Sequence, residues 1–382
     1  MKINKAYRNS DIINNLEDLE FLYKFKDFPV FMGCTHKSVD EDILIDMQWE
    51  ISKNSGVIQL NPLLPLEILY LEPHGSGVIG DIWLEHHQEF AKFIKKQTPK
   101  SVLEIGGLHG ILSREYKKEN VVDWTIIEPN PSPAEDVDVV FIKGFFNEKF
   151  SFDGQLDTII HSHVFEHVYY PNEFVSQISN LLKEGDKLIF SVPNLEEMLK
   201  RKYTNCLNFE HTIFITEPYI NYLLSKNGFE LLDKQYFRDD HSIFYAYEKS
   251  TNVEIVTLPK NLYKHNKNLY LEYIGYHEQL INDLNVKIDN SDPKSQIYLF
   301  GAHIFSQSLI QLGLKTSRIL YLLDNDPNKQ GKRLYGTDMI VKSPNCIEVD
   351  ENPIIILKAG VYNNEIKKDI LENINRKAEF WE

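Results

Sequence analysis

Several features that decide a protein's class are scarce or missing in this chain of 382 residues. Its three cysteines, Cys34, Cys206 and Cys346, lie far apart and form no Cys-x-x-Cys pair. This spacing excludes a disulfide framework and a cysteine zinc site, and it is typical of a protein in a reducing cytoplasm. The first residues contain no apolar core of the signal-peptide type, and no apolar run approaches the ~18 residues of a membrane span. We therefore expect a cytoplasmic protein without a membrane segment.

Positive charge is also in short supply. The chain has 41 Lys and Arg against 56 Asp and Glu, which gives a net charge of −15. Binding of a nucleic acid needs a basic face, so this balance argues against a nucleic-acid partner. A small-molecule substrate, including an anionic one held by local cations, stays compatible with it. The oligomeric state is left open.

The Gly-x-Gly-x-x-Gly fingerprint of a dinucleotide site is absent, and a different glycine pattern stands in its place. Residues 101–110 indicate a buried strand followed by the turn Glu-x-Gly-Gly-x-x-Gly. Glu104 precedes the first glycine by two positions, where it would repel a pyrophosphate but suit a cationic ligand group. Residues 124–130 indicate the next strand, which ends in Glu128, an acid placed to bind a ribose.

Two further segments continue this alternation of strands and helices. Residues 156–168 indicate an apolar strand that runs into a polar cluster and a short helix. Residues 139–146 indicate a strand that ends in a glycine and two phenylalanines, which either flank an adenine or belong to the core. A glycine-rich turn in another kind of doubly wound domain remains the alternative explanation of these patterns.

In this order, the four segments resemble class I methyltransferases that use S-adenosylmethionine (SAM). The resemblance implies that SAM is the cofactor and that Glu104 faces its cationic amino-acid end. It also implies a set of cofactor-binding residues: Glu104, Gly106, Gly107, His109, Gly110, Glu128, Pro129, Gly144, Phe145, Ser162 and His163.

The rest of the chain indicates additional units, and the predicted fold class is α/β. We expect a small N-terminal α+β extension over 1–88, a Rossmann-like SAM methyltransferase core over 89–250, a helical connector over 251–290 and a second Rossmann-like α/β domain over 291–382. Short strands are expected at 28–32 and 56–60, and a helix from near Asp81 towards Lys96. The C-terminal unit has only Gly301-Ala302 at its first turn, so it predicts a structural or substrate-binding role more than a dinucleotide site.

Together with the core, the leader sequence Gly-Val-Ile-Gln-Leu and the tail sequence Asp-Asn-Asp-Pro-Asn-Lys-Gln-Gly-Lys resemble nucleotide-sugar C-methyltransferases. These enzymes act on deoxysugars that carry a keto group. The resemblance implies that Glu210 and His211 match the family's catalytic Glu-His pair, with His211 as general base. It also implies that His167 is a second histidine near the substrate.

The chain departs from this family at two places. The leader lacks the family's four zinc cysteines apart from Cys34, so we expect no metal. Asn208 stands where the family has a tyrosine, and His74 and Ser76 stand in place of a tyrosine-rich loop. We predict that Asn208, His74 and Ser76 bind the substrate.

The residue types fit methyl transfer to carbon, which needs a base beside a carbonyl group and stabilisation of an enolate. The same residues would serve an oxygen or nitrogen acceptor, so an O- or N-methyltransferase acting on an activated sugar or a small metabolite is the second hypothesis. A third is a nucleotide-binding protein without catalytic activity.

Overall fold

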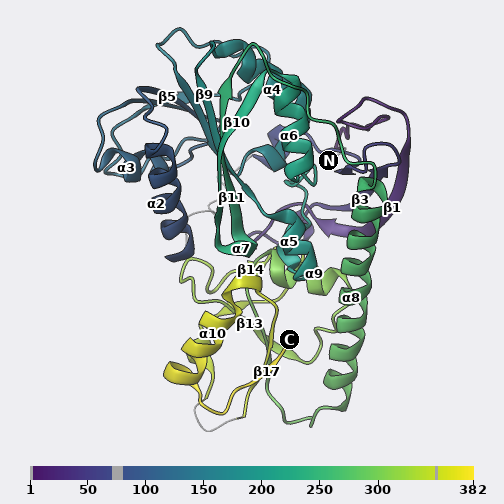
Figure 1. Cartoon of the computed structure of the whole chain (residues 1–382). Helices are drawn as coiled ribbons and strands as arrows, with labels where there is room; N and C mark the ends of the chain where they lie inside the picture. The colour runs from purple at the N-terminus through teal and green to yellow at the C-terminus, as the bar shows by residue number, and fades with distance from the viewer. Residues whose placement is uncertain (1–2, 71–80, 349–351) are drawn as a thin grey trace.

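The computed structural model describes residues 3–70, 81–348 and 352–382. Two α/β units follow one another along the chain, and an antiparallel leader sheet lies beside them (Figure 1). A long helix, α8 (Leu262–Asn290), runs along one side of the molecule and connects the two units. Among the helices of the described ranges, none has the length and hydropathy needed to cross a membrane.

The first unit is built on a seven-stranded sheet in the order β10-β11-β9-β8-β5-β6-β7. Strand β11 runs antiparallel to both of its neighbours, and the pairs from β9 to β7 are parallel. The strand order reverses between β5 and β8, which creates a crevice at the carboxyl ends of these strands. The strands are β5 (Ser101–Ile105), β6 (Asp123–Glu128), β7 (Val140–Lys143), β8 (Thr158–Ser162), β9 (Lys187–Pro193), β10 (Phe229–Phe237) and β11 (Ser242–Lys249).

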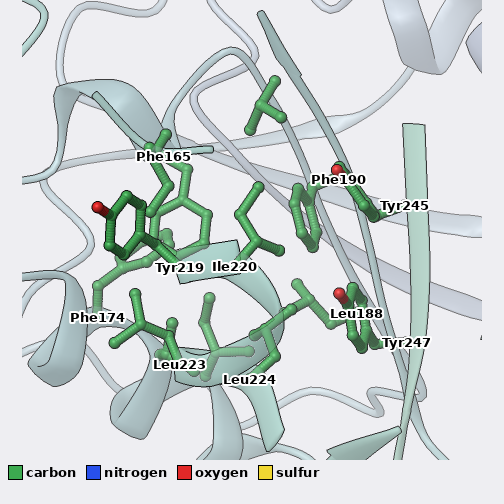
Figure 2. Packing of buried hydrophobic residues seen from close by; sticks show 14 of the residues in the cluster. Phe165, Phe174, Leu188, Phe190, Tyr219, Ile220, Leu223, Leu224, Tyr245 and Tyr247 are labelled. Atoms are coloured by element: carbon green, nitrogen blue, oxygen red, sulfur yellow. The ribbon is translucent and has the colours of Figure 1, made fainter. Parts of the chain in front are cut away.

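Helices cover both faces of this sheet, which explains why its central strands β5 and β8 are almost entirely buried and do not alternate between buried and exposed side chains. The helices α2 (Asp81–Lys95) and α3 (Ile111–Lys117) lie on one face, and α4 (Pro171–Leu181) and α6 (Glu217–Lys226) lie on the other. Figure 2 shows how the α6 residues Ile220, Leu223 and Leu224 pack against aromatic side chains of the sheet. Phe190 and Tyr245 stack there with ring centroids 5.3 Å apart.

The leader forms an antiparallel sheet of β1 (Leu19–Pro29), β3 (Leu44–Ser52) and β4 (Ile58–Leu60). Buried and partly exposed side chains alternate along β3, as expected for a sheet with one face on a core. The short strand β2 (Cys34–Thr35) pairs with β14 (Arg333–Leu334), so the leader also contacts the C-terminal unit. The short helices α1 (Leu66–Leu69) and η1 (Val39–Glu41) complete the leader.

The second unit is a five-stranded parallel sheet in the order β15-β13-β12-β16-β17. Its strand order reverses between β12 and β16, which makes a second crevice of the same kind. The strands are β12 (Ile297–Phe300), β13 (Ile319–Leu323), β15 (Val341–Lys342), β16 (Ile354–Leu357) and β17 (Glu379–Trp381). The helical segments are α9 (Ile304–Gln311), η5 (Pro344–Cys346), η6 (Gly360–Tyr362), α10 (Asn363–Asp369) and the π-helix η7 (Ile370–Ile374).

The predicted fold class is confirmed: a Rossmann-like core, a small leader and a second parallel α/β unit. The predicted domain boundaries remain predictions, and the one at 88 falls within the continuous helix α2. The strand expected over 28–32 was wrong at its end. It stops at Pro29, because the chain then turns towards Gly33, which has a φ of +90°.

Candidate active site

One cavity of about 1350 Å³ lies where the crevices of the two sheets open. The loops after β5 and β8 line it on the side of the first unit. Residues 303–305, after β12, and residues 359, 361 and 362, after β16, line it on the side of the second unit. Both reversal points therefore face the same space, and any ligand in it has access to two sets of strand ends.

The glycine turn after β5 supplies a wall of bare backbone. Gly106 has a φ of +79°, a left-handed backbone conformation that glycine adopts more readily than other residues. A Cβ atom on Gly107 would lie 2.7 Å from Cγ2 of Ile126, so only glycine lets the loop lie this close to β6. Gly110 is different, because it does not line the cavity and its Cβ would meet Val137 at 2.6 Å. Its role here is to let the start of α3 pack, and contact with the cofactor stays a prediction for it.

Glu128 ends β6 and faces the cavity. Its two carboxylate oxygens accept the backbone N–H groups of Leu108 (3.2 Å) and Asn130 (2.9 Å). These bonds hold the carboxylate in place and use two of its roughly four lone-pair sites. The remaining sites are available to the hydroxyl groups of a ribose, so the acid fits the role predicted for it.

Glu104 also lines the cavity, but it is only 3% exposed. Nε1 of Trp124 donates to its Oε2 at 2.8 Å. Burial raises the pKa of Glu104 to about 7, although the bond from Trp124 opposes this rise. The carboxyl group therefore gains or loses its proton near neutral pH, and a cationic ligand beside it would favour the charged form.

Aromatic side chains flank the turn on the other side. Phe145 lies beside Tyr70, with ring centroids 6.3 Å apart, and both line the cavity. Nδ2 of Asn130 donates to the carbonyl oxygen of Tyr70 at 2.5 Å, which ties α1 to the loop after β6. Phe146 packs against Phe150 and Phe174 of the core, so of the two phenylalanines Phe145 is the better placed to contact an adenine.

His211 also lines the cavity, in the segment after the short helix η4 (Thr204–Cys206). Its Nδ1 lies 2.9 Å from the carbonyl oxygen of Cys206. Because a carbonyl only accepts, Nδ1 carries the proton and Nε2 carries the lone pair. Oδ1 of Asn208 accepts the backbone N–H groups of Glu210 and His211, each at 2.8 Å. Asn208 thus fixes the Glu-His pair through the backbone, which also explains why asparagine serves at this position.

Glu166 is the main site residue that was not predicted from the sequence. It lies in the helix η3 (Phe165–His167), lines the cavity and is completely buried. Its Oε1 lies 3.3 Å from Nδ1 of His163 and 3.6 Å from Nε2 of His167. Nδ1 of His167 lies 3.8 Å from Oε2 of Glu210. The sequence did contain one indication of its role. Glu166 stands next to His167 in the polar cluster after β8, and acidic residues are rarely buried unless they are paired.

His163 is held from several sides. Its Nε2 lies 2.9 Å from Oγ of Ser242, and its ring meets Trp83 edge-on at 4.9 Å. Burial lowers the pKa of His163 to about 3, so this ring is neutral. The neighbouring strand-end histidine, His161, lies in the core. It is fully buried and stacks on Phe190, with ring centroids 4.8 Å apart.

The structure brings nearly all of the predicted site residues to this cavity. His74 and Ser76 lie outside the described residues, and Gly110 lies behind the turn. The others all line the cavity: Glu104, Gly106, Gly107, His109, Glu128, Pro129, Gly144, Phe145, Ser162, His163, His167, Asn208, Glu210 and His211. Residues of the second unit, including His303, Phe305 and Tyr362, were not foreseen as part of the site.

A model of the methyltransferase domain matches residues 82–234, the segment that carries the glycine turn, Glu128 and the acidic and histidine side chains. Residues 82–234 form a methyltransferase domain. The protein is therefore an enzyme of the methyltransferase class, and its cofactor is SAM. No curated protein matches the chain.

Three similar solved structures each cover less than half of the chain. A SAM-dependent methyltransferase from Mesorhizobium loti is 10% identical, with a TM-score of 0.35 over 44% of this chain and 100% of that one. The 1,6-didemethyltoxoflavin-N1-methyltransferase of Burkholderia thailandensis is 19% identical, with a TM-score of 0.35 over 44% and 81%. The magnesium protoporphyrin IX methyltransferase of Synechocystis PCC 6803 is 17% identical, with a TM-score of 0.35 over 46% and 90%.

The residues of the first unit fit the cofactor. The bare backbone at Gly106 and Gly107 and the anchored carboxylate of Glu128 offer surfaces for its amino-acid and ribose parts. When bound, SAM supplies an electrophilic methyl group on a sulfonium. The protein's task is then to hold the acceptor at attacking distance and to accept a proton.

Proposed function

We propose that this enzyme methylates a nucleotide-linked sugar, with a carbon atom beside a keto group as the acceptor and His211 as the general base. The observation that carries the proposal is the shared cavity. Two parallel sheets present their reversal points to one space, and each such point is a common place for a nucleotide to bind. The first point serves SAM, and the second is left for the nucleotide of the acceptor.

The second unit offers side chains suited to a nucleotide base. Phe305 and Tyr362 line the cavity and contact each other edge-on, with ring centroids 6.2 Å apart. His303 lies next to them at the start of α9. Aromatic faces bind bases by stacking, which is tolerant of base identity. Asp324 ends β13 but is engaged by the N–H of Ala302 (2.8 Å) and by Nζ of Lys329 (3.0 Å), so we assign the base and not the ribose to this side.

The chemistry follows from the state of His211. Burial lowers the pKa of its imidazole, although Glu166 opposes this effect, so the ring is neutral at pH 7. Its Nε2 lone pair is then ready to take the proton from the carbon beside the carbonyl. His167 lies beside His211, with ring centroids 5.2 Å apart, and supplies a polar group for the developing oxyanion.

The second candidate is O- or N-methylation of a related activated sugar or small metabolite. The same Nε2 atom would take a proton from a hydroxyl group or an amine. Exchange separates the two candidates, because only carbon chemistry labels the position next to the carbonyl. We expect deuterium to enter that position in D₂O without SAM, while an acceptor recovered unlabelled would favour the second candidate.

The experiment that tests the proposal is turnover with SAM and a panel of nucleotide-linked keto sugars, each paired with its free sugar. We expect methylated product from at least one nucleotide-linked compound and none from the free sugar. Equal turnover of the free sugar would remove the role of the second unit. We also propose the cytoplasm as the compartment, in keeping with three unpaired cysteines.

A further inference from the structure

Glu166, His167 and His211 form a compact group of potential metal ligands on the wall of the cavity. One ligand atom from each residue can be chosen so that all three atoms lie within 4.8 Å of one another. Glu166 and His167 come from η3, whereas His211 comes from the segment after η4. The N–H of Thr212 donates to the carbonyl oxygen of Glu166 at 2.9 Å, so a backbone bond holds the two segments together.

The carboxylate of Glu166 is the second, independent sign of a ligand. It is fully buried, and within the described ranges neither of its oxygens has a hydrogen-bond partner. A buried carboxylate without hydrogen bonds carries a large cost, which a cation at the site would offset. The imidazoles of His163 and His167 lie 3.3 and 3.6 Å from its Oε1.

We propose that Glu166, His167 and His211 bind a divalent transition-metal ion, with zinc as the expected ion. Two imidazoles and one carboxylate are a ligand set of zinc sites that keep a position open for substrate. Magnesium and calcium prefer oxygen ligands only, so they fit this set poorly. No metal was expected because the leader lacks the zinc cysteines, but this site uses no cysteine.

The geometry of His211 suits the assignment. Its Nδ1 is committed to the carbonyl oxygen of Cys206, which orients the ring and leaves Nε2 as the ligand atom. Glu210 lies on the far side of His167, 3.8 Å from Nδ1, and is placed to orient that second imidazole. All three residues line the cavity, so an open position of the ion would face it.

The metal site does not depend on the methyl acceptor, and Nε2 of His211 cannot hold an ion and accept a proton at once. His211 can therefore act as the general base only while its Nε2 is free of metal. Zinc binding is measured on the full chain alone, without SAM or sugar, so a failure to methylate any sugar would overturn the proposed function and leave this result untouched.

The test starts from chelated protein that is incubated with zinc, desalted and analysed for metal content. We expect about one zinc per chain for the natural protein, and a loss of at least tenfold in affinity for Glu166→Gln and for His167→Ala. The matched control is His265→Ala, which removes a half-exposed histidine paired with Glu196 on the surface and should retain the zinc. Less than a tenth of an equivalent in the natural protein would overturn the proposal.

Loading the natural protein with cobalt identifies the type of ligand without relying on the folding of a variant. Cobalt in the proposed site gives visible absorption without thiolate-to-metal charge transfer, and Glu166→Gln abolishes it. Thiolate charge transfer would place the ion on a cysteine and overturn the assignment, as would unchanged zinc affinity in both ligand variants. Zinc should also raise the unfolding temperature of the natural protein but not that of Glu166→Gln.

Discussion

Arg333 and Asp42 form a two-pronged ion pair between the second α/β unit and the leader. Nη1 lies 2.7 Å from Oδ2, and Nη2 lies 2.8 Å from Oδ1. The side chains are only 8% and 2% exposed. Arg333 also donates to the carbonyl oxygens of Lys37 and Ser38, so its guanidinium group is fully engaged.

Removal of one partner of this pair should therefore lower the stability of the folded protein. We expect Asp42→Ala to lower the free energy of unfolding by about 3–5 kcal/mol, because it leaves a buried guanidinium without its carboxylate. Urea unfolding followed by circular dichroism measures the change. The control is Asp289→Ala, which removes a half-exposed partner of Lys315 and should change the stability by less than about 0.5 kcal/mol. Equal effects of the two changes would contradict the role of the pair.

His211→Ala should lower turnover by roughly 10²–10⁴-fold, the usual contribution of a general acid or base. The affinity for SAM should stay nearly constant, because His211 is not among the residues predicted to bind the cofactor. Steady-state kinetics and calorimetric titration with SAM measure the two effects. Turnover unchanged from that of the natural protein, with His265→Ala as the reference variant, would remove His211 from the mechanism.

Glu104 predicts a particular dependence of stability on pH. Its pKa is raised from 4.5 to about 7 in the folded protein, first by burial. Between these two values the folded protein keeps a proton that the unfolded chain has lost, so its stability falls as the pH rises. At 1.36 kcal/mol per pKa unit, the fall is on the order of 3 kcal/mol. Glu104→Gln should remove this slope.

The measurement for Glu104 compares urea unfolding of the two proteins at pH 5 and pH 8. Other titrating groups contribute equally to both, so the difference between the proteins isolates Glu104. The same loss of stability in both proteins across this range would show that Glu104 is not the group responsible.

Phe305→Ala and Tyr362→Ala should weaken binding of the nucleotide-linked acceptor and spare SAM. Loss of one stacking surface costs about 1–3 kcal/mol, which corresponds to roughly 5- to 150-fold in affinity. Titrations with the nucleotide-linked sugar and with SAM measure the two affinities separately. The control is Tyr321→Ala, a partly exposed residue of β13 that does not line the cavity. A matching loss for SAM would place the aromatic pair at the cofactor instead.

The sequence was most informative where a residue type answers a local requirement. Short-range rules predict the glycine turn, the acid at the end of β6 and the buried strands. In the structure, the turn and the acid line the same cavity. The helix α8 followed in the same way from its periodic apolar positions, such as Leu269, Tyr273 and Leu280. Short-range rules did not show whether His161 faces the cavity or the core, since a histidine at the end of a strand can do either.

Contacts between segments that lie far apart in the chain could not be predicted from the sequence. Glu166 is significant only because His211 is brought beside it, and the distance in sequence gives no sign of that. His303, Phe305 and Tyr362 belong to the site only because the second sheet points its strand ends at the first. Arg333 and Asp42 meet for the same reason, which is the packing of the units and not any local motif.

The opposed strand ends would also limit the length of the nucleotide-linked acceptor proposed above. An acceptor that is to be held at both walls must reach from the aromatic pair of the second unit to the imidazole of the first. A molecule that is too short leaves one wall unused, and one that is too long cannot bring its reacting atom to the sulfonium. The separation of the two sheets would thus set the length of acceptor that can react. Lengthening the linkage between base and sugar should stop methylation even when both ends are recognised.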